Sequence, residues 1–275
     1  MRKPFSSNRQ SAQTSSSPWA RPEDGKRVSV HWPPPAPIPR IEEPVPVPAP
    51  ARVHHAILLI AFLPSFAAGM LNQFYLEPAF RISPALFFLA DAVQWIVIPL
   101  LVWLLVLRPA NFRPRDFGLR LPVLGTRPFE SLLLFAFCAF LLWASYAAIE
   151  AIAYQFFWRE AGIFGYDAAI PKTFPWNILV VVYLSITAAV VEEVVFRGMT
   201  WTYFSKIVPA QSLTLCYILG SSILFAATHS EQGTPGLIAA MAYGMVAAAL
   251  YVRLKDLWPL VFAHFIVDVI SFWPK

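Results

Sequence analysis

Residues 177–204 read NILVVVYLSITAAVVEEVVFRGMTWTYF, an apolar run interrupted by two adjacent acids, Glu192 and Glu193, and by Arg197. A helix needs about 20 apolar residues to cross about 30 Å of hydrocarbon, and this run is long enough. Ionisable side chains at membrane depth are costly and usually face a polar interior. The stretch therefore predicts a membrane helix that carries a buried polar site.

Six further apolar runs surround this one. With 57% hydrophobic and 13% charged residues, the composition fits a membrane protein, because soluble domains carry roughly 25% charged residues. The runs are continuous and do not alternate, which excludes a transmembrane barrel. We therefore predict an all-α, polytopic transmembrane bundle of about seven helices within residues 54–275. The runs cover residues 55–74, 84–107, 129–157, 177–204, 211–229, 235–252 and 257–273.

Residues 1–53 form a separate Ser- and Pro-rich region that contains WPPPAPIPRIEEPVPVPAP. It lacks apolar periodicity, so we predict a disordered tail that is partly polyproline II. The net charge of +5 comes without a basic stripe interleaved with aromatic residues, so no nucleic-acid partner is expected. Most basic residues lie in the tail and in the second loop, which predicts a cytoplasmic tail. The loop residues are Arg108, Arg113, Arg115, Arg120 and Arg127.

One apolar run has a pattern that indicates packing and not chemistry. Small residues recur every four positions in the run 235–252, which places them on one helix face and permits close approach of a neighbouring helix. These residues are Gly236, Ala240, Gly244 and Ala248.

The three charged residues of 177–204 divide by helical geometry. Glu193 and Arg197 are four positions apart with the acid first, the favoured order for a helical ion pair. Glu192 points about 100° away from Glu193 and lies off the arginine's stripe. We predict that arginine neutralises Glu193, whereas Glu192 is free to act.

Polar groups also interrupt two later runs. His229 follows Phe225 by four positions near the end of the fifth run. His264 and Asp268 are four positions apart in the seventh run, so they share one helix face and indicate a hydrated cavity. Counting about 1.5 Å per residue from the cytoplasmic turns, these groups differ in depth from one another and from Glu192 by roughly 10 Å. Helix tilt, a kink or a shallower helix start has to close that gap if one site is to form.

Three short motifs follow in order on these runs: EEVVFR, FAATH and HFIVD. They fit Glu-Glu-x-x-x-Arg, Phe-x-x-x-His and His-x-x-x-(Asn/Asp). In this order the chain resembles the CAAX-protease and bacteriocin-processing (Abi) family of intramembrane proteases, which includes the Ras-converting prenyl endopeptidases. The resemblance covers roughly residues 177–273.

The resemblance implies a role for each matching residue. Glu192 matches the glutamate that activates the hydrolytic water, assisted by His229. His264 and Asp268 match the pair that faces the oxyanion, and Glu193 and Arg197 support the site. The prenyl endopeptidases carry Asn where this chain has Asp268. An ionised carboxylate only accepts hydrogen bonds, so Asp268 has to be protonated, orient His264 or bind a metal.

We therefore expect an intramembrane endopeptidase in a bacterial plasma membrane, where lipid and a membrane-associated peptide or protein substrate, prenylated or not, are its partners. Two alternatives stay open. One is a metal-dependent protease, with zinc or another divalent ion held by Glu192, His229, His264 and Asp268. The other is a non-catalytic immunity or scaffold protein that binds a peptide without cutting it. No other cofactor is expected.

Overall fold

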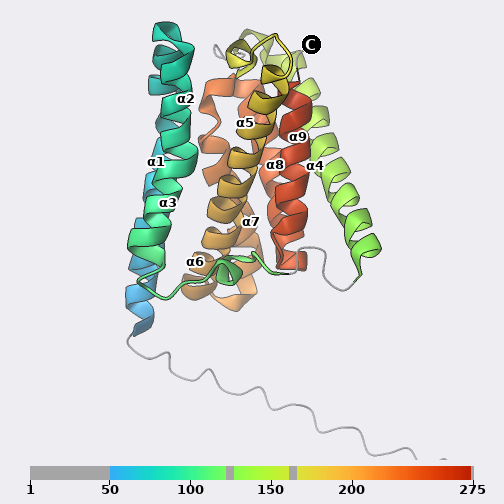
Figure 1. Cartoon of the computed structure of the whole chain (residues 1–275). Helices are drawn as coiled ribbons and strands as arrows, with labels where there is room; N and C mark the ends of the chain where they lie inside the picture. Colours follow the sequence, from blue (N-terminus) through green and yellow to red (C-terminus); the bar gives the residue numbers. More distant parts are fainter. Residues whose placement is uncertain (1–49, 122–126, 161–165, 274–275) are drawn as a thin grey trace, which may run out of the picture. The chain divides into compact units, whose positions relative to one another are not determined.

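The computed structural model describes residues 50–121, 127–160 and 166–273 (Figure 1). Every regular element in these three ranges is helical, as predicted. The predicted tail, residues 1–53, lies outside them except for residues 50–53, which open the first helix. Its predicted disorder therefore stays a prediction.

The described part of the chain contains seven apolar helical stretches. Six are long and apolar enough to span a membrane, and the last, with 15 residues, is shorter. The predicted bundle of about seven membrane helices is confirmed. The α-helices are α1 (Pro50–Ile82), α2 (Pro84–Ala92), α3 (Ile98–Val102), α4 (Pro128–Phe157), α5 (Trp176–Glu192), α6 (Thr200–Ile207), α7 (Ala210–Ala227), α8 (Gly233–Leu254) and α9 (Trp258–Phe272).

Two of the spanning stretches contain π-helical turns. The stretch Pro84–Leu107 joins α2 and α3 through such turns, and Trp176–Ile207 joins α5 and α6 through a π-helical segment, Glu193–Met199. π-Helical turns are rare and occur frequently at functional sites. The second of them begins directly after Glu192, at the charged residues that interrupt the predicted run.

The helices that carry the three motifs surround one interior. α8 packs against α4 and α7, while α9 packs against α4 and α5. α1 packs along α2 and also contacts α6. The first two spanning stretches therefore lie against the helices that carry the motifs (Figure 1). Residues from both ends of the membrane domain thus meet at the same centre.

The small residues of α8 pack as predicted. Ala240, Gly244 and Ala248 are buried, and α8 lies against α7. A Cβ atom added at Gly244 would lie 3.0 Å from the Cα atom of Ser222 on α7. Glycine at this position therefore permits the close approach of the two helices.

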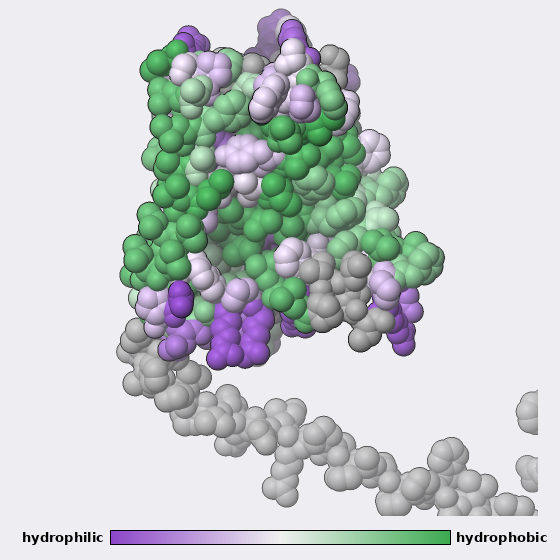
Figure 2. Space-filling view, in the orientation of Figure 1, coloured by the Kyte–Doolittle hydropathy of each residue, from purple (hydrophilic) through white to green (hydrophobic). Residues whose placement is uncertain are grey.

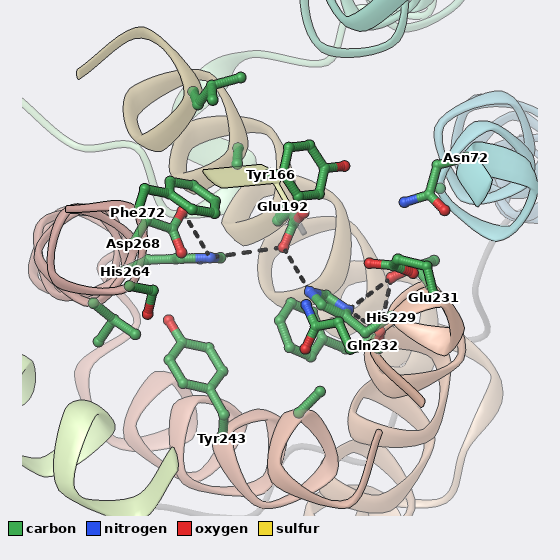
Figure 3. A pocket seen from close by; sticks show the side chains of 18 of the residues that line it. Asn72, Tyr166, Glu192, His229, Glu231, Gln232, Tyr243, His264, Asp268 and Phe272 are labelled. Atoms are coloured by element: carbon green, nitrogen blue, oxygen red, sulfur yellow. Dashed lines mark hydrogen bonds and ion pairs between the residues drawn. The ribbon is translucent and has the colours of Figure 1, made fainter. Parts of the chain in front are cut away.

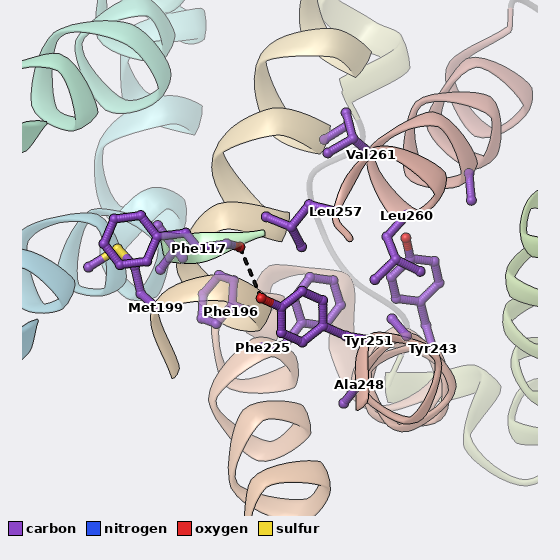
Figure 4. Close-up of a cluster of buried hydrophobic side chains, with 14 of the residues drawn as sticks. Phe117, Phe196, Met199, Phe225, Tyr243, Ala248, Tyr251, Leu257, Leu260 and Val261 are labelled. Atoms are coloured by element: carbon purple, nitrogen blue, oxygen red, sulfur yellow. Dashed lines mark hydrogen bonds between the residues drawn. The ribbon is translucent and has the colours of Figure 1, made fainter. Parts of the chain in front are cut away.

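The loop that follows the second spanning stretch, Pro84–Leu107, closes one end of the bundle. The Phe117 carbonyl accepts a hydrogen bond from the Tyr251 hydroxyl at 3.0 Å (Figure 4), and the Gly118 carbonyl accepts one from the Leu257 amide at 3.0 Å. Gly198 of the π-helical segment lies so close that a Cβ there would collide with the Phe117 carbonyl oxygen. These contacts fix the π-helical segment against the loop.

The outer surface of the helices is apolar. Figure 2 shows a broad hydrophobic band across the visible face of the bundle, with hydrophilic residues gathered toward the two ends. Large apolar side chains such as Leu105, Phe140 and Leu215 are 70%, 63% and 63% exposed. A soluble protein does not expose a continuous apolar surface of this kind. Together with the six spanning stretches, this surface identifies an integral membrane protein.

Candidate active site

A cavity of about 120 Å³ lies inside the bundle (Figure 3). A buried water needs only about 10–15 Å³ of such space, so the cavity has room for several. α1, α2, α4, α5, α7, α8 and α9 all contribute to its wall. The four residues predicted to be catalytic all line it: Glu192, His229, His264 and Asp268.

Glu192 is the point on which both histidines converge. Its side chain is 7% exposed, and its Oε2 atom lies 3.9 Å from His229 Nε2 and 3.7 Å from His264 Nε2 (Figure 3). Neither distance is short enough for a direct hydrogen bond, and Oε2 has no hydrogen-bond partner within the described residues. Groups separated in this way suit a water molecule that bridges them.

The gap in depth that the count along the sequence gave is closed by a difference in where the helices begin, one of the ways expected. Figure 1 shows the turn between α6 and α7 reaching beyond the level at which α9 begins. His229, at the far end of α7, therefore reaches the same depth as His264 in the middle of α9. The two histidines meet at one carboxylate, as the distances to Glu192 show.

The orientation of His229 follows from a local hydrogen bond. Its Nδ1 atom lies 2.9 Å from the Phe225 carbonyl oxygen at the end of α7. A carbonyl oxygen only accepts, so Nδ1 carries the proton and donates. In neutral His229 the Nε2 atom then holds a lone pair that faces Glu192. The four-residue spacing of Phe-x-x-x-His therefore lets the histidine donate to a carbonyl at the helix end, and this bond fixes the orientation of the ring.

His264 lies between three carboxylates. Its Nδ1 atom is 2.8 Å from Glu193 Oε1, and its Nε2 atom is 3.6 Å from Asp268 Oδ2, in addition to the contact with Glu192. An ionised Glu193 only accepts, so Nδ1 donates to it and Nε2 faces the cavity. Glu193 therefore holds the ring in place from behind.

The predicted ion pair between Glu193 and Arg197 is present. Arg197 Nε lies 3.2 Å from Glu193 Oε2, and both side chains are completely buried. The Arg197 guanidinium also lies 4.2 Å from the centre of the Phe225 ring, a favourable cation–π contact. Arg197 does not line the cavity; it stands behind Glu193 and Phe225.

Hydroxyl groups of α7 support the π-helical segment. Ser221 donates to the Phe196 carbonyl at 2.6 Å, and Tyr217 donates to the Arg197 carbonyl at 3.3 Å. A buried carbonyl that lacked a partner would be costly, so these hydroxyls stabilise the irregular turn. The first motif is consequently anchored to the helix that carries the second.

The cavity also contains polar residues that the motifs do not include. Asp91 and Asn72 lie in apolar runs, so the rule for polar groups at membrane depth could have identified them. The tyrosines could not be identified from the sequence by this rule, because tyrosine is common in membrane helices. The additional polar residues include Asn72, Asp91, Tyr146, Tyr166, Glu231, Gln232 and Tyr243.

The four residues predicted as possible metal ligands all line this one cavity. Across residues 50–121, 127–160 and 166–273, no group of three or more His, Cys, Asp or Glu side chains is arranged to hold a metal ion.

Comparison with known proteins gave one match. Residues 174–270 match the family model described as "Type II CAAX prenyl endopeptidase Rce1-like". The matched range holds all three motifs and leaves out α1 to α4. No curated protein and no solved structure matched the chain.

Proposed function

We propose that this integral membrane protein, whose residues 174–270 match the CAAX prenyl endopeptidase family model, hydrolyses a peptide bond of a membrane-associated substrate by a glutamate-activated water. The observation that carries the proposal is the convergence of His229 and His264 on Glu192 at 3.9 Å and 3.7 Å. A water placed between these atoms contacts a base and a second acceptor at once.

In the proposed reaction, Glu192 removes a proton from the water while the water oxygen attacks the scissile carbonyl carbon. His229 accepts the other hydrogen bond of the water at Nε2 and sets its direction. The carbonyl π-electrons move to the oxygen, which becomes the oxyanion of a tetrahedral intermediate. Glu192 then returns the proton to the leaving amine as the carbon–nitrogen bond breaks.

His264 is placed to stabilise the oxyanion. A donor at Nε2 in addition to the Nδ1 donor requires the imidazolium form, for which the surrounding carboxylates supply compensating negative charge. Hydrogen-bond donors fixed in advance at a developing oxyanion are among the largest contributions to acyl-transfer catalysis. Asp268, 3.6 Å from Nε2, orients the imidazole in this account.

The proposal predicts activity without a metal. Purified protein in liposomes, assayed on candidate peptides, is expected to keep its rate within about twofold after treatment with strong chelators, because water activation rests on Glu192. Peptide products are quantified by mass spectrometry. Loss of activity that returns on addition of zinc would instead support a metal-dependent protease.

We further propose that the protein sits in a bacterial plasma membrane with the loop Arg108–Arg127 and the tail in the cytoplasm. The hydrogen bond between the Gly118 carbonyl and Leu257 brings this basic loop to the α8–α9 turn, which holds Lys255. α1 begins at the same end of the bundle (Figure 1). Basic residues collected at one end favour the cytoplasmic side.

The orientation is tested with single exposed cysteines in a background that lacks Cys138 and Cys216. A membrane-impermeant maleimide added to intact cells is expected to label Lys172→Cys and to leave Arg115→Cys unlabelled until the cells are permeabilised. The reverse pattern would refute the assigned orientation.

A further inference from the structure

Two acids of the cavity have no role in the proposed reaction. Asp91 of α2 is completely buried and lines the cavity, yet neither of its carboxylate oxygens makes a hydrogen bond of ordinary geometry. The Tyr183 hydroxyl of α5 interacts with this carboxyl group. A carboxylate can accept about four hydrogen bonds, so most of the acceptor capacity of Asp91 stays unused.

Glu231 is the second acid, in the short turn that follows His229. Its Oε2 atom is buried and has no hydrogen-bond partner within the described residues. Asn72 of α1 lies beside it on the cavity wall (Figure 3) and interacts with its carboxyl group; Asn72 is 4% exposed, and its Oδ1 atom has no hydrogen-bond partner within the described residues. Three residues from three parts of the chain thus present unused acceptor oxygens to one space.

On the described wall of the cavity, acidic groups outnumber cationic ones, for which the proposed reaction supplies only the His264 imidazolium. Four carboxylates line it, those of Asp91, Glu192, Glu231 and Asp268, and no Lys or Arg is found among the described residues of the wall. Arg197 does not reach this space, because it pairs with Glu193 behind the Phe225 ring. Such a wall attracts a cation and repels a carboxylate.

Aromatic rings beside these acids suit a cation as well. Trp95 and Tyr166 line the same cavity as Asp91 and Glu231. The face of an indole or phenol ring attracts an ammonium or guanidinium group, and more strongly when water is excluded. The acceptor oxygens and the rings together resemble a binding site for an alkyl cation.

We propose that Asp91, Glu231 and Asn72 form a subsite for the basic side chain, Lys or Arg, of a substrate residue near the bond that Glu192 hydrolyses. An ammonium group has three donors and a guanidinium five, which match the unpartnered oxygens. The inference rests on the proposed peptidase function and adds a substrate class to it. Asp91 and Asn72 lie outside residues 174–270, so this selectivity belongs to helices that the family model does not cover.

The test uses peptides that differ only in charge. Purified full-length protein in liposomes of uncharged lipid is assayed on paired peptides with lysine or norleucine at each position near the cleavage site. Hydrogen bonds to a buried charge are worth about 10–100-fold, so the lysine peptide is expected to have the higher kcat/KM by that factor. Asp91→Asn and Glu231→Gln are each expected to lower this preference, and Glu130→Gln, an exposed acid on α4, is expected to leave it unchanged.

Binding separates this inference from the proposed chemistry. Fluorescent versions of the same peptides are titrated onto the Glu192→Gln variant, and their anisotropy gives Kd without any cleavage. A lysine preference in Kd that weakens in combination with Asp91→Asn or Glu231→Gln supports the subsite even if no peptide is ever cut. Equal Kd values for the lysine and norleucine peptides, or a preference that neither substitution changes, would overturn it. If Asp91→Asn does not fold, as judged by thermal melting, Glu231→Gln alone decides.

Discussion

Replacing Glu192 by Gln is expected to lower kcat for peptide hydrolysis by about 10²–10⁴-fold, the usual contribution of a general base. Glutamine has nearly the same size and keeps one acceptor oxygen, but it cannot take a proton from water. The side chain is 7% exposed and its Oε2 atom faces two histidines, so no bulk solvent is at hand to replace the carboxylate. Initial rates on a cleaved peptide, measured in liposomes, give the ratio.

The matched control for this prediction is Glu130→Gln, because Glu130 is an exposed acid at the start of α4 whose side chain is 65% accessible. Its rate is expected to equal that of the wild type. Binding of substrate to Glu192→Gln is expected to persist, since the shape of the cavity is kept. A variant that hydrolyses peptide at half the wild-type rate would remove Glu192 from the chemistry. A biological effect that survives the substitution would favour the non-catalytic scaffold.

Replacing Arg197 by Met is expected to lower the free energy of unfolding by about 3–5 kcal/mol, the cost of leaving one partner of a buried ion pair without the other. Both Arg197 and Glu193 have side chains with no exposure to solvent. Methionine fills similar volume, so the loss reports mainly the uncompensated charge of Glu193. Thermal or denaturant-induced unfolding in detergent micelles, followed by circular dichroism, measures the change.

The double variant Glu193→Gln/Arg197→Met provides the control. Removing both charges eliminates the uncompensated carboxylate, so the double variant is expected to be more stable than Arg197→Met alone. The comparison also separates stability from catalysis, because Glu193 holds His264 Nδ1 at 2.8 Å and its loss affects the orientation of that ring. Equal stability of the wild type and Arg197→Met would mean that the buried pair does not stabilise the fold.

Much of the fold was predictable because a membrane simplifies the physical problem. Each spanning helix has to be long and apolar, and the seven runs in the sequence correspond to the seven helical stretches. The ion pair of Glu193 and Arg197 was predictable because spacing along a helix fixes which side chains meet. The packing of Gly244 against Ser222 followed from the same geometry.

Other features depend on tertiary contacts that no local pattern encodes. The π-helical segment Glu193–Met199 is one of them. The loop at Phe117 packs against Gly198, and hydroxyl groups of α7 donate hydrogen bonds to carbonyls of the segment. These partners lie far away in sequence. The common depth of His229 and His264 depends on the level at which each helix begins. Asp91 could have been noticed as an acid in an apolar run, but only the fold shows that it lines the same cavity as Glu231.

The central claim is that the cavity around Glu192 hydrolyses peptide bonds. Its most direct test is mass spectrometry of a membrane-peptide library incubated with liposomes that contain either the wild-type protein or Glu192→Gln. The account predicts paired fragments from the wild type, whose masses sum to that of a substrate plus one water, and none above background from Glu192→Gln. Fragment pairs produced equally by both proteins, or by neither while peptides bind to both, would contradict it.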